Sequence, residues 1–242
     1  EKRAVEKYET DGGKEVFIME EPMAAAIGVG LQVDSPTGCM ITDIGGGTSD
    51  IAIISLGGIV TSTSLRMAGD KMNEAIIYYI RKMYGLLIGE KMAEKAKIAI
   101  GCAFVDESDP DWVLRSNISG RDLATGLPKT IEISSRDICS ALEESVKEIV
   151  DGIKATLENA PPELAADIIN TGMVMAGGGS LLRGLDVLIE RETGIATMIA
   201  ENASEAVAMG TGLSLQNMET IMTHVRAKNP YANVNTNNNN TY

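Results

Sequence analysis

The chain has 242 residues, a hydrophobic fraction of 44% and a formal net charge of −13. This length and apolar content predict a folded protein with one large domain or two small ones, and the 25 glycines suit an α/β fold. The acidic balance argues against a nucleic-acid-binding protein, because phosphate backbones require a basic surface. Cys39, Cys102 and Cys139 are few and widely spaced, which indicates neither a disulfide framework nor a zinc site and fits a reducing cytosol.

The first quarter of the chain predicts alternating helices and strands. A charged helix is expected over Glu1–Glu9, a short strand over Glu15–Met19, and an alanine-rich helix with proline in its first turn over Pro22–Gly30. The stretch Thr37–Met67 predicts several strands separated by glycine turns, because short β-branched runs alternate there with Gly clusters.

The middle of the chain predicts two helices and a pair of strands. The helices cover Asp70–Tyr84 and Glu90–Ile100, and the acidic stretch Phe104–Asp111 predicts a solvated loop. Trp112–Ile118 and Lys129–Ile133 are expected to pair as strands. Apolar side chains on one face of the first helix predict its buried side: Met72, Ile76, Tyr79, Ile80 and Met83.

A long helix is predicted over Ser135–Glu158, with Ser134 or Ser135 as its N-cap. A short helix is expected around Glu163–Ile169, after two prolines. The buried stripe of the long helix comprises Ile138, Leu142, Val146, Ile149, Ile153 and Leu157.

The last quarter begins with a predicted strand over Met173–Ala176, which a glycine turn joins to a helix ending near Arg191. A short strand over Thr197–Ala200 and a helix over Ser204–Gln216 follow. The asparagine-rich sequence after Asn229 predicts a disordered tail. Because strands alternate with helices, we expect a mixed or largely parallel sheet with helices on both faces.

Residues 43–50, DIGGGTSD, form the most informative motif. Glycine accepts unusual backbone angles and lets the chain approach a bound group closely, so that Gly45–Gly47 can form a nest of amides for phosphate oxygens. Asp43, at the end of the preceding strand, is placed to hold a hydrated magnesium ion, and Thr48 supplies a hydroxyl. The alternative is an ordinary hairpin turn.

Three other features lie near predicted strand ends or on helices. Glu21 follows the first strand, where it either orients a water for in-line attack or is simply a carboxylate favoured at a helix N-terminus. The second glycine turn, Gly177–Ser180, either approaches a ligand or makes a tight connection. Glu94 and Lys97 lie one helical turn apart, which is the spacing of an exposed ion pair and also allows contact with a ribose or purine.

In order along the chain, EEPMAAAIG, DIGGGTSD, AGDKMNEAI, MAGGGSLLRGLD and EAVAMGTGLSL resemble the actin/Hsp70/sugar-kinase ATPase superfamily. Within it, ISLGGIVTSTSLRMAGDKMNEAI, NISGRDLATGLPKTIEI and PPELAADI are similar to the MreB family of bacterial actin homologues. The resemblance extends to about residue 225. It implies an α/β, ribonuclease H-like fold of mixed sheets flanked by helices, in two lobes around a nucleotide cleft.

The resemblance also implies a division into subdomains. Residues 1–33 and 200–228 correspond to parts of subdomain IA, residues 34–68 and 133–199 to IIA, and residues 69–132 to IIB. Residues 229–242 are the Asn-rich tail, which is not a family feature and hints at an AT-rich genome and a wall-less, spiroplasma-like bacterium.

Roles for individual residues follow from the same resemblance. Glu21 corresponds to the water-activating residue, Thr48 to the threonine near the γ-phosphate of ATP, and Asp43 to the Mg²⁺-associated aspartate. The implied cofactors are ATP or ADP with Mg²⁺. The remaining positions, which we expect to bind the nucleotide, are Gly45, Gly46, Gly47, Gly69, Glu94, Lys97, Gly177, Gly178 and Gly179.

The chain also departs from the family pattern. No first phosphate loop of the type DLGTANT precedes Glu1, and nothing matches subdomain IB. We therefore expect the C-terminal part of such a protein, with an incomplete first lobe and weak ATP binding when isolated. Ser49 and Asp50 replace the usual threonine and glutamate, and the family's membrane-binding elements are not seen.

The expected function is that of a cytoskeletal ATPase whose paired homopolymeric filaments govern cell shape, or motility in a wall-less cell. Its expected partners are its own copies, the inner face of the cell membrane and other cell-shape proteins, and no nucleic acid. No apolar run reaches the length of a membrane span. The resemblance implies a cytoplasmic protein at that membrane face. The alternatives are an Hsp70-type chaperone, which needs a substrate-binding β-domain, and a metabolite kinase, which needs a catalytic aspartate.

Overall fold

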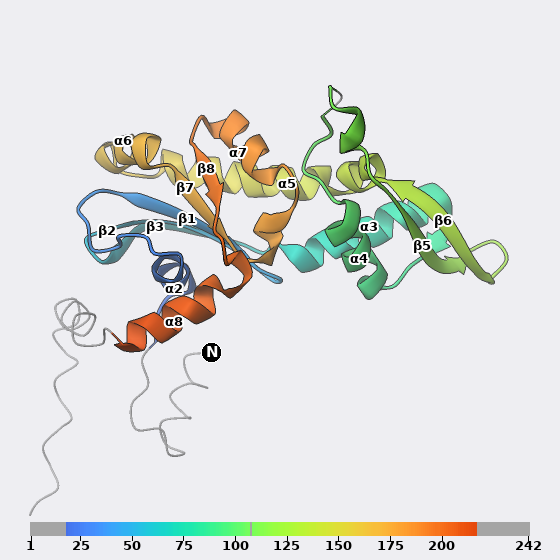
Figure 1. Ribbon diagram of the computed structural model, residues 1–242, viewed down its shortest axis with the longest axis horizontal. Helices are drawn as coiled ribbons and strands as arrows, with labels where there is room; N and C mark the ends of the chain where they lie inside the picture. Colours follow the sequence, from blue (N-terminus) through green and yellow to red (C-terminus); the bar gives the residue numbers. More distant parts are fainter. Residues whose placement is uncertain (1–17, 107, 217–242) are drawn as a thin grey trace, which may run out of the picture.

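The computed structural model describes residues 18–106 and 108–216. Two β-sheets lie toward opposite ends of an elongated molecule, one of five strands in the order β3-β2-β1-β7-β8 and one of three strands in the order β4-β5-β6 (Figure 1). The predicted helix Glu1–Glu9, most of the predicted strand Glu15–Met19 and the predicted disordered tail lie outside the described residues.

The larger sheet is mixed, as predicted. Strands β1 (Cys39–Ile44), β2 (Ser49–Ser55) and β3 (Gly58–Leu65) are consecutive and antiparallel, whereas β7 (Met173–Ala176) and β8 (Thr197–Ile199) run parallel to β1. The three consecutive strands account for the predicted stretch Thr37–Met67. Strand β1 lies at the centre with all six residues buried, which is expected of a strand covered on both faces.

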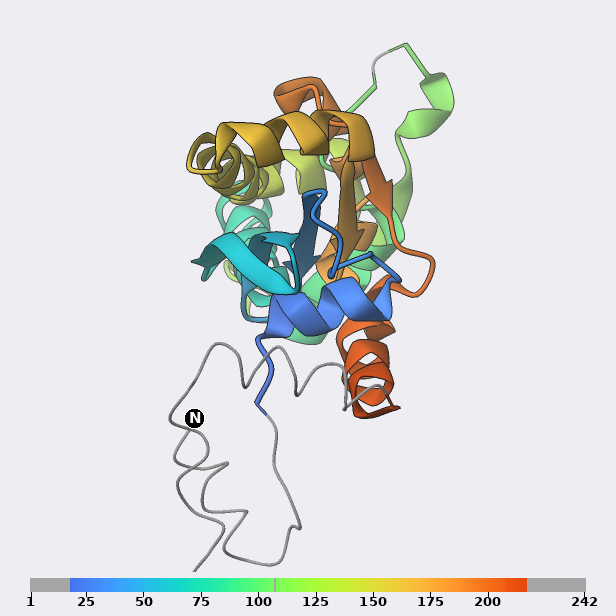
Figure 2. The same cartoon turned by 90° about the vertical axis from the view of Figure 1, so that its left-hand side faces the viewer.

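Helices cover both faces of this sheet, which confirms the prediction (Figure 2). Helices α5 (Ser135–Glu158), α6 (Pro162–Thr171) and α7 (Leu185–Thr193) lie on one face, and α2 (Glu21–Gly28) and α8 (Ala206–Gln216) on the other. Alternate residues of the strands lie in two separate hydrophobic cores, one on each face of the sheet. Met40, Ile44, Ile51 and Ile53 belong to the core on the α5 side, whereas Cys39, Ile41, Ala52 and Ile54 belong to the α2 side.

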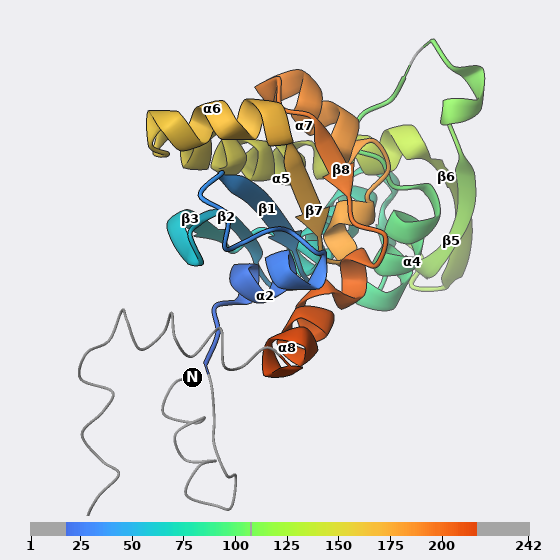
Figure 3. The same ribbon diagram turned by 60° about the vertical axis from the view of Figure 1, so that its left-hand side comes forward.

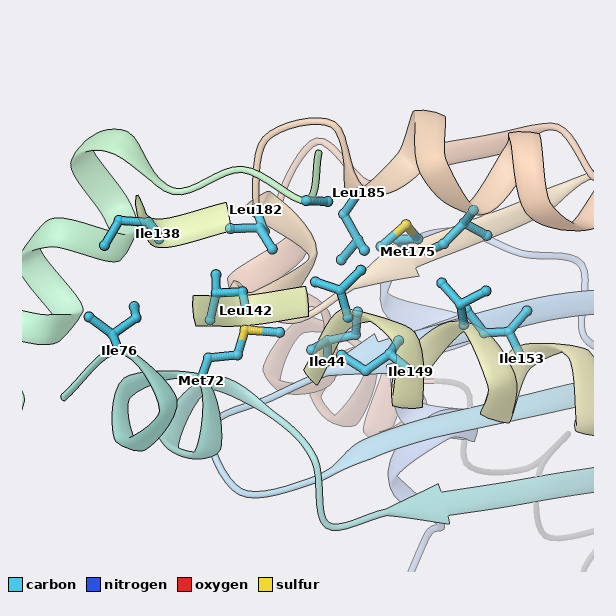
Figure 4. Packing of buried hydrophobic residues seen from close by; sticks show 14 of the residues in the cluster. Ile44, Met72, Ile76, Ile138, Leu142, Ile149, Ile153, Met175, Leu182 and Leu185 are labelled. Carbon is cyan, nitrogen blue, oxygen red and sulfur yellow. The ribbon is translucent and has the colours of Figure 1, made fainter. Parts of the chain in front are cut away.

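The long helix α5 forms the centre of the larger core. Its bounds are those predicted, and Ile138, Leu142, Ile149 and Ile153 point from it toward the sheet and α3 (Figure 4). Val146 is also buried and Leu157 partly so, which confirms the predicted stripe. The N-cap is Ser134, whose backbone N–H and hydroxyl both donate to the Asp137 carboxylate three residues later.

The smaller sheet is built by the segment between β3 and α5. Helices α3 (Gly69–Tyr84) and α4 (Glu90–Ile100) are confirmed, and β4 (Leu86–Leu87), β5 (Arg115–Asp122) and β6 (Pro128–Ser134) form the sheet. The predicted strand pair therefore exists, although β5 starts three residues later than predicted. The structure adds β4, which is too short to give a periodic signal.

Two expectations about this segment are wrong. Met83 is 58% exposed, because it lies at the end of α3, past the last buried turn at Ile80. Trp112 is not in a strand but ends a 3₁₀ turn, η1 (Pro110–Trp112), and its ring stacks on Phe104 with 5.2 Å between centroids. An aromatic pair therefore joins the first residue of the predicted solvated loop to the residue that directly follows it.

The helices near the C-terminal end are more broken than predicted. A 3₁₀ turn, η2 (Gly178–Leu181), follows β7 and is separated from α7 by Gly184, whose φ is +75°. Another 3₁₀ turn, η3 (Ala203–Glu205), precedes α8, and β8 ends one residue earlier than predicted. Positive φ values and short 3₁₀ turns are local features that apolar periodicity does not register.

Helices α2 and α8 pack backbone against backbone. A Cβ atom on Gly28 would overlap the carbonyl group of Ala206, and one on Gly210 would overlap that of Ala24. Glycine at both positions permits this approach, which brings together two segments that we expected to share one subdomain. Within the described residues, no helix combines the length and apolar character needed to cross a membrane.

Candidate functional site

Both glycine turns start at the same edge of the larger sheet. Strands β1 and β7 are parallel neighbours, with Asp43 opposite Ala176, and each strand ends where its glycine turn begins (Figure 3). Open α/β sheets bind ligands outside the carboxyl ends of parallel strands. The topology therefore brings Gly45–Gly47 and Gly177–Gly179 to one place, although they are far apart in sequence.

The first turn, Gly45–Gly47, rests on the N-terminus of α3. The Gly45 N–H donates to the Thr48 carbonyl over 2.9 Å and closes the β1–β2 hairpin. The carbonyl groups of Gly45 and Gly46 accept from the N–H groups of Gly69 at 3.1 Å and Asp70 at 2.8 Å. The turn is therefore an ordinary hairpin connection in its bonding, but one that is fixed to a helix end.

One face of this first turn remains open. Gly46 and Gly47 are exposed, a Cβ atom on Gly47 would meet no other atom within 4 Å, and one on Gly46 would meet only the Asp70 carboxylate at 3.7 Å. None of the three glycines has a positive φ, so the expectation that glycine is needed here for unusual backbone angles is wrong. Glycine was expected here for two reasons, and the geometry is compatible only with the second, which is close approach of the backbone to a bound group.

The second turn, Gly177–Gly179, is packed tightly against the first strand. Gly177 has a φ of +79°, and a Cβ atom there would overlap the Ile44 carbonyl and the Asp43 carboxylate. A Cβ atom on Gly179 would overlap the Ile44 side chain. Gly178 alone is exposed, with only the Ser204 hydroxyl near its Cβ position. Tight connection is therefore the role that the contacts of Gly177 and Gly179 show.

Asp43 is a buried carboxylate with acidic neighbours. Its side chain is 4% exposed, and burial, followed by the charges of Glu21 and Asp50, raises its pKa to about 6. Asp50 lies directly opposite on β2 and accepts a 2.8 Å hydrogen bond from the Thr48 hydroxyl. Glu21 lies exposed in the first turn of α2. The charges of Glu21 and Asp50 therefore act on Asp43, and within the described residues no ion pair joins it to a basic side chain.

A divalent cation fits this environment. A cation near Asp43 would offset the repulsion from Glu21 and Asp50 that raises the pKa of the buried carboxyl group. Among the described residues no group of three or more His, Cys, Asp or Glu side chains is arranged as a metal site. Mg²⁺ commonly uses one or two carboxylates together with water and phosphate oxygens, so that Asp43 would hold it mainly through water.

Lys97 is joined to the first turn through α3. Its Nζ donates a 2.8 Å hydrogen bond to the Gly69 carbonyl, at the point where Gly69 itself donates to Gly45. Burial lowers the pKa of Lys97, and the charges of Glu94 and Asp70 oppose that shift. Lys97 is half-buried and bonded to backbone, while Glu94 is exposed, so the reading as an exposed ion pair does not describe it.

Sequence reasoning gave no role to Asp70 and treated Asp50 only as a conservative replacement. Asp70 lies beside Gly46 and near Lys97, and Asp50 orients the Thr48 hydroxyl. The acidic residue in the first turn of α3 was visible in the motif AGDKMNEAI, and its place at a helix N-terminus is a usable signal.

The fold and the paired turns define the actin-like class of proteins. MreB5 of Spiroplasma citri bound to ADP superposes with a TM-score of 0.85 and 37% sequence identity, covering 92% of this chain and 67% of that one. The MamK double helical filament superposes with a TM-score of 0.70 at 21% identity, covering 90% and 64%, which supports the fold alone.

Sequence similarity identifies the family within that class. The profile of the MreB/Mbl protein family matches residues 1–223, and the chain belongs to this family. The cell shape-determining proteins Mbl of Bacillus subtilis (strain 168) and MreB of Escherichia coli (strain K12) are each 48% identical to it, over 222 and 217 residues. These matches cover 91% and 89% of the chain but only 66% and 61% of the two relatives. The resemblance to MreB is thereby confirmed, and none of these relatives supports the Hsp70-type alternative.

Proposed function

We propose that the chain belongs to an actin-like cytoskeletal protein that binds ATP with Mg²⁺ and hydrolyses it. One observation carries this proposal: Gly46 and Gly47, whose open face the packing of the protein does not require, follow the buried carboxylate of Asp43 just after the end of β1. MreB5 of Spiroplasma citri has been solved with ADP and with AMPPNP, which supports a nucleotide at the corresponding place.

Each residue has a defined task in this proposal. The amides of Gly45–Gly47 bind phosphate oxygens, and Asp43 holds Mg²⁺ through water. Glu21 and Thr48 orient the attacking water, with Asp50 fixing the Thr48 hydroxyl through their hydrogen bond. The bound Mg·ATP supplies the phosphoryl group that is transferred to water.

The nucleoside end of ATP is assigned to the other predicted positions. Lys97 and Gly69 form a bonded unit at the N-terminus of α3, and Glu94 lies exposed one helical turn before Lys97. On the opposite turn, Gly178 is the exposed glycine and the one free to contact a ligand, whereas Gly177 and Gly179 hold the turn against β1.

We extend the proposal to polymerisation. Copies of the protein assemble with ATP into paired filaments, and hydrolysis weakens the filament. The cell shape-determining relatives Mbl and MreB support this proposal. Attachment to the inner face of the cell membrane, where other cell-shape or motility proteins would act with the filament, belongs to the same proposal and accords with a cytoplasmic location.

Binding is tested with Gly46→Val in the protein, using titration with a fluorescent ATP analogue. The valine side chain occupies the open face of the turn, and we expect at least about a tenfold loss of affinity, since a close backbone approach is blocked. The matched control is Gly89→Val, because Gly89 also has open space and a negative φ but precedes α4 away from the turn. Equal affinities in two folded variants would remove Gly45–Gly47 from the binding site.

Hydrolysis is tested separately with Glu21→Ala and Thr48→Ala. A well-placed acid–base group contributes about 10²–10⁴-fold to rate, so we expect slower phosphate release with retained nucleotide binding, and filaments that persist longer in pelleting assays. The control is Glu20→Ala, which removes a neighbouring exposed carboxylate of the same kind. Phosphate release at the wild-type rate in both variants would refute these two assignments and leave the binding assignment intact.

A further inference from the structure

The fold brings two of the three cysteines together. Cys102 lies two residues after α4, and Cys139 lies in the second turn of α5. The Cys102 thiol donates to the carbonyl of Ser135 on α5, and the Cys139 thiol donates to the carbonyl of Ala103, each over 3.7 Å. The two thiols thus bond reciprocally across the contact between the two segments. The expectation from their wide spacing in sequence is therefore incomplete, because it could not register this proximity.

A cation lies beside this pair. Arg183 donates from Nη2 to the Ser135 hydroxyl over 3.1 Å, and its guanidinium group lies 4.9 Å from the centre of the Trp112 ring. Its carbonyl accepts from the Ala103 N–H, which holds the Arg183 backbone next to Cys102. The Nε of Arg183 is buried and has no hydrogen-bond partner in the described part of the chain. A buried donor without a partner favours an anion nearby.

The pKa values of the two thiols are shifted in opposite directions. The side-chain interaction with Cys139, and then the interaction with and charge of Arg183, lower the pKa of Cys102 despite its burial. The hydrogen bond with Cys102, burial and the charge of Glu143 raise the pKa of Cys139. The pair therefore loses its first proton more readily than an ordinary thiol does, while Cys39, whose pKa is raised by burial, does not.

Solvent reaches the pair from one side. Cys102 is fully buried, whereas Cys139 is half-buried and lines a groove of about 830 Å³ between α5, α7 and the loop after α4. Phe104, Arg136, Glu143 and Leu188 also line this groove. A small solute can therefore contact the Cys139 sulfur first, with Cys102 directly behind it.

We propose that Cys102 and Cys139 form a reactive dithiol that hydrogen peroxide converts into an intramolecular disulfide. The pair first releases one proton to solvent. The remaining proton passes from Cys139 to Cys102 as the Cys139 sulfur attacks a peroxide oxygen, which gives a sulfenic acid and hydroxide, and the hydroxide takes up the released proton to become water. The Cys102 sulfur attacks the Cys139 sulfur, the S–S bond forms as the S–O bond breaks, and the hydroxide leaves as water with the Cys102 proton. Two thiols lose two electrons, and one peroxide becomes two waters.

The disulfide would join the segment that follows α4 to the first turns of α5. Because α4 carries Lys97, which is bonded to the start of α3, the crosslink would restrain that helix from its C-terminal end. This inference does not depend on the proposed ATPase function, since the chemistry involves only the thiols, Arg183 and peroxide.

The crosslink is tested by treating the protein with a small excess of hydrogen peroxide, alkylating the remaining thiols and mapping peptides by mass spectrometry. We expect a linked peptide pair containing Cys102 and Cys139, with Cys39 alkylated. Cys39→Ser should give the same link, and Cys139→Ser should give none. Oxidation of Cys139 to a sulfinate without a link, or links only between separate copies of the chain, would overturn the proposal.

The role of the cation is tested by comparing Arg183→Gln with Arg191→Gln. Arg191 is a matched control, because its guanidinium group lies 4.8 Å from the neighbouring Phe104 ring, as Arg183 lies over Trp112. Loss of the Arg183 charge should slow disulfide formation about tenfold near neutral pH, since the thiolate fraction falls by that factor for each unit of pKa. The Arg191 variant should react at the wild-type rate.

The pH profile of the wild-type protein gives a second measurement that needs no variant. Its oxidation rate should reach half of its maximum clearly below the pKa of about 8.5 of a free thiol. A midpoint at or above that value, or equal slowing by both arginine variants, would overturn the assignment.

Discussion

The two three-glycine turns lie at one edge of the same sheet, yet their glycines differ in packing and in backbone angles. Gly177 and Gly179 are surrounded by the protein itself, with a φ of +79° at Gly177 and the backbone or side chain of Ile44 against both positions. Gly46 and Gly47 have exposed backbones, no positive φ and space where a side chain would go. The fold requires glycine in the second turn, whereas nothing in the packing or backbone angles of the first turn requires it at Gly46 or Gly47. The same three-glycine motif therefore forms a tightly packed structural turn at one place and, at the other, an open turn that we propose binds the nucleotide.

The largest effect on the free energy of unfolding should come from Gly177→Ala. Placing alanine at positive φ costs about 1–2 kcal/mol, and overlap with Ile44 and Asp43 adds a similar amount, so the free energy of unfolding should fall by about 2–4 kcal/mol. The matched control is Gly178→Ala in the same turn, which should change it by less than about 0.5 kcal/mol because its Cβ position is open. Urea denaturation measures both. Equal losses in the two variants would break the distinction between packed and open positions.

The next largest effect on stability should come from the ionisation of Asp43, which contacts the second turn at Gly177. The folded-state pKa of about 6 exceeds the ordinary 3.8, so between these pH values the folded protein binds more protons than the unfolded chain. The stability of the ligand-free protein should therefore fall as pH rises from about 4 to 6 and stay lower above that range.

Asp43→Asn isolates this contribution. After allowance for solvent screening, the variant should be more stable than wild type by about 1–3 kcal/mol at pH 7, and the difference should vanish near pH 4. Denaturation at several pH values without nucleotide or magnesium provides the measurement. A variant that is less stable than wild type at pH 7 would contradict the unpaired state of Asp43.

A smaller change in stability than that of Asp43→Asn should come from Gly47→Ala. Its φ is not positive and its Cβ position is empty, so reduced freedom of the unfolded chain should leave stability unchanged or raise it by about 0.4–1 kcal/mol. Nucleotide affinity should nevertheless fall. A clear loss of stability with unchanged affinity would place this turn in the same structural category as Gly177–Gly179.

Much of the fold could be predicted because its long elements carry regular patterns. The bounds of α5 follow from its apolar stripe and its capping residue, and those of β7 from a short apolar run that ends at glycine. The two-residue strand β4 and the 3₁₀ turns could not be predicted, because their few residues give no period. The exposure of Met83 was missed because helical periodicity does not reveal where the partner surface ends.

The sequence motifs named the candidate site residues but could not show their contacts. The motifs named Asp43, Gly45–Gly47 and Lys97, and the structure brings them around the ends of β1 and α3. Sequence could not show that Lys97 bonds the Gly69 carbonyl or that Gly177 packs on Asp43, because both contacts join segments distant along the chain. The pairing of Cys102 with Cys139 was hidden for the same reason.

The crossing of α2 and α8 at Gly28 and Gly210 has a mechanical consequence. If either helix slid or rolled on the other, a Cα atom would clash with a facing carbonyl group. We therefore expect the two helices to move as one rigid unit. Glu21 lies at the N-terminal end of α2, where its charge acts on Asp43. We therefore expect that a molecule bound to the exposed side of α8 would shift Glu21 relative to the end of β1, and so would influence the geometry of the candidate site.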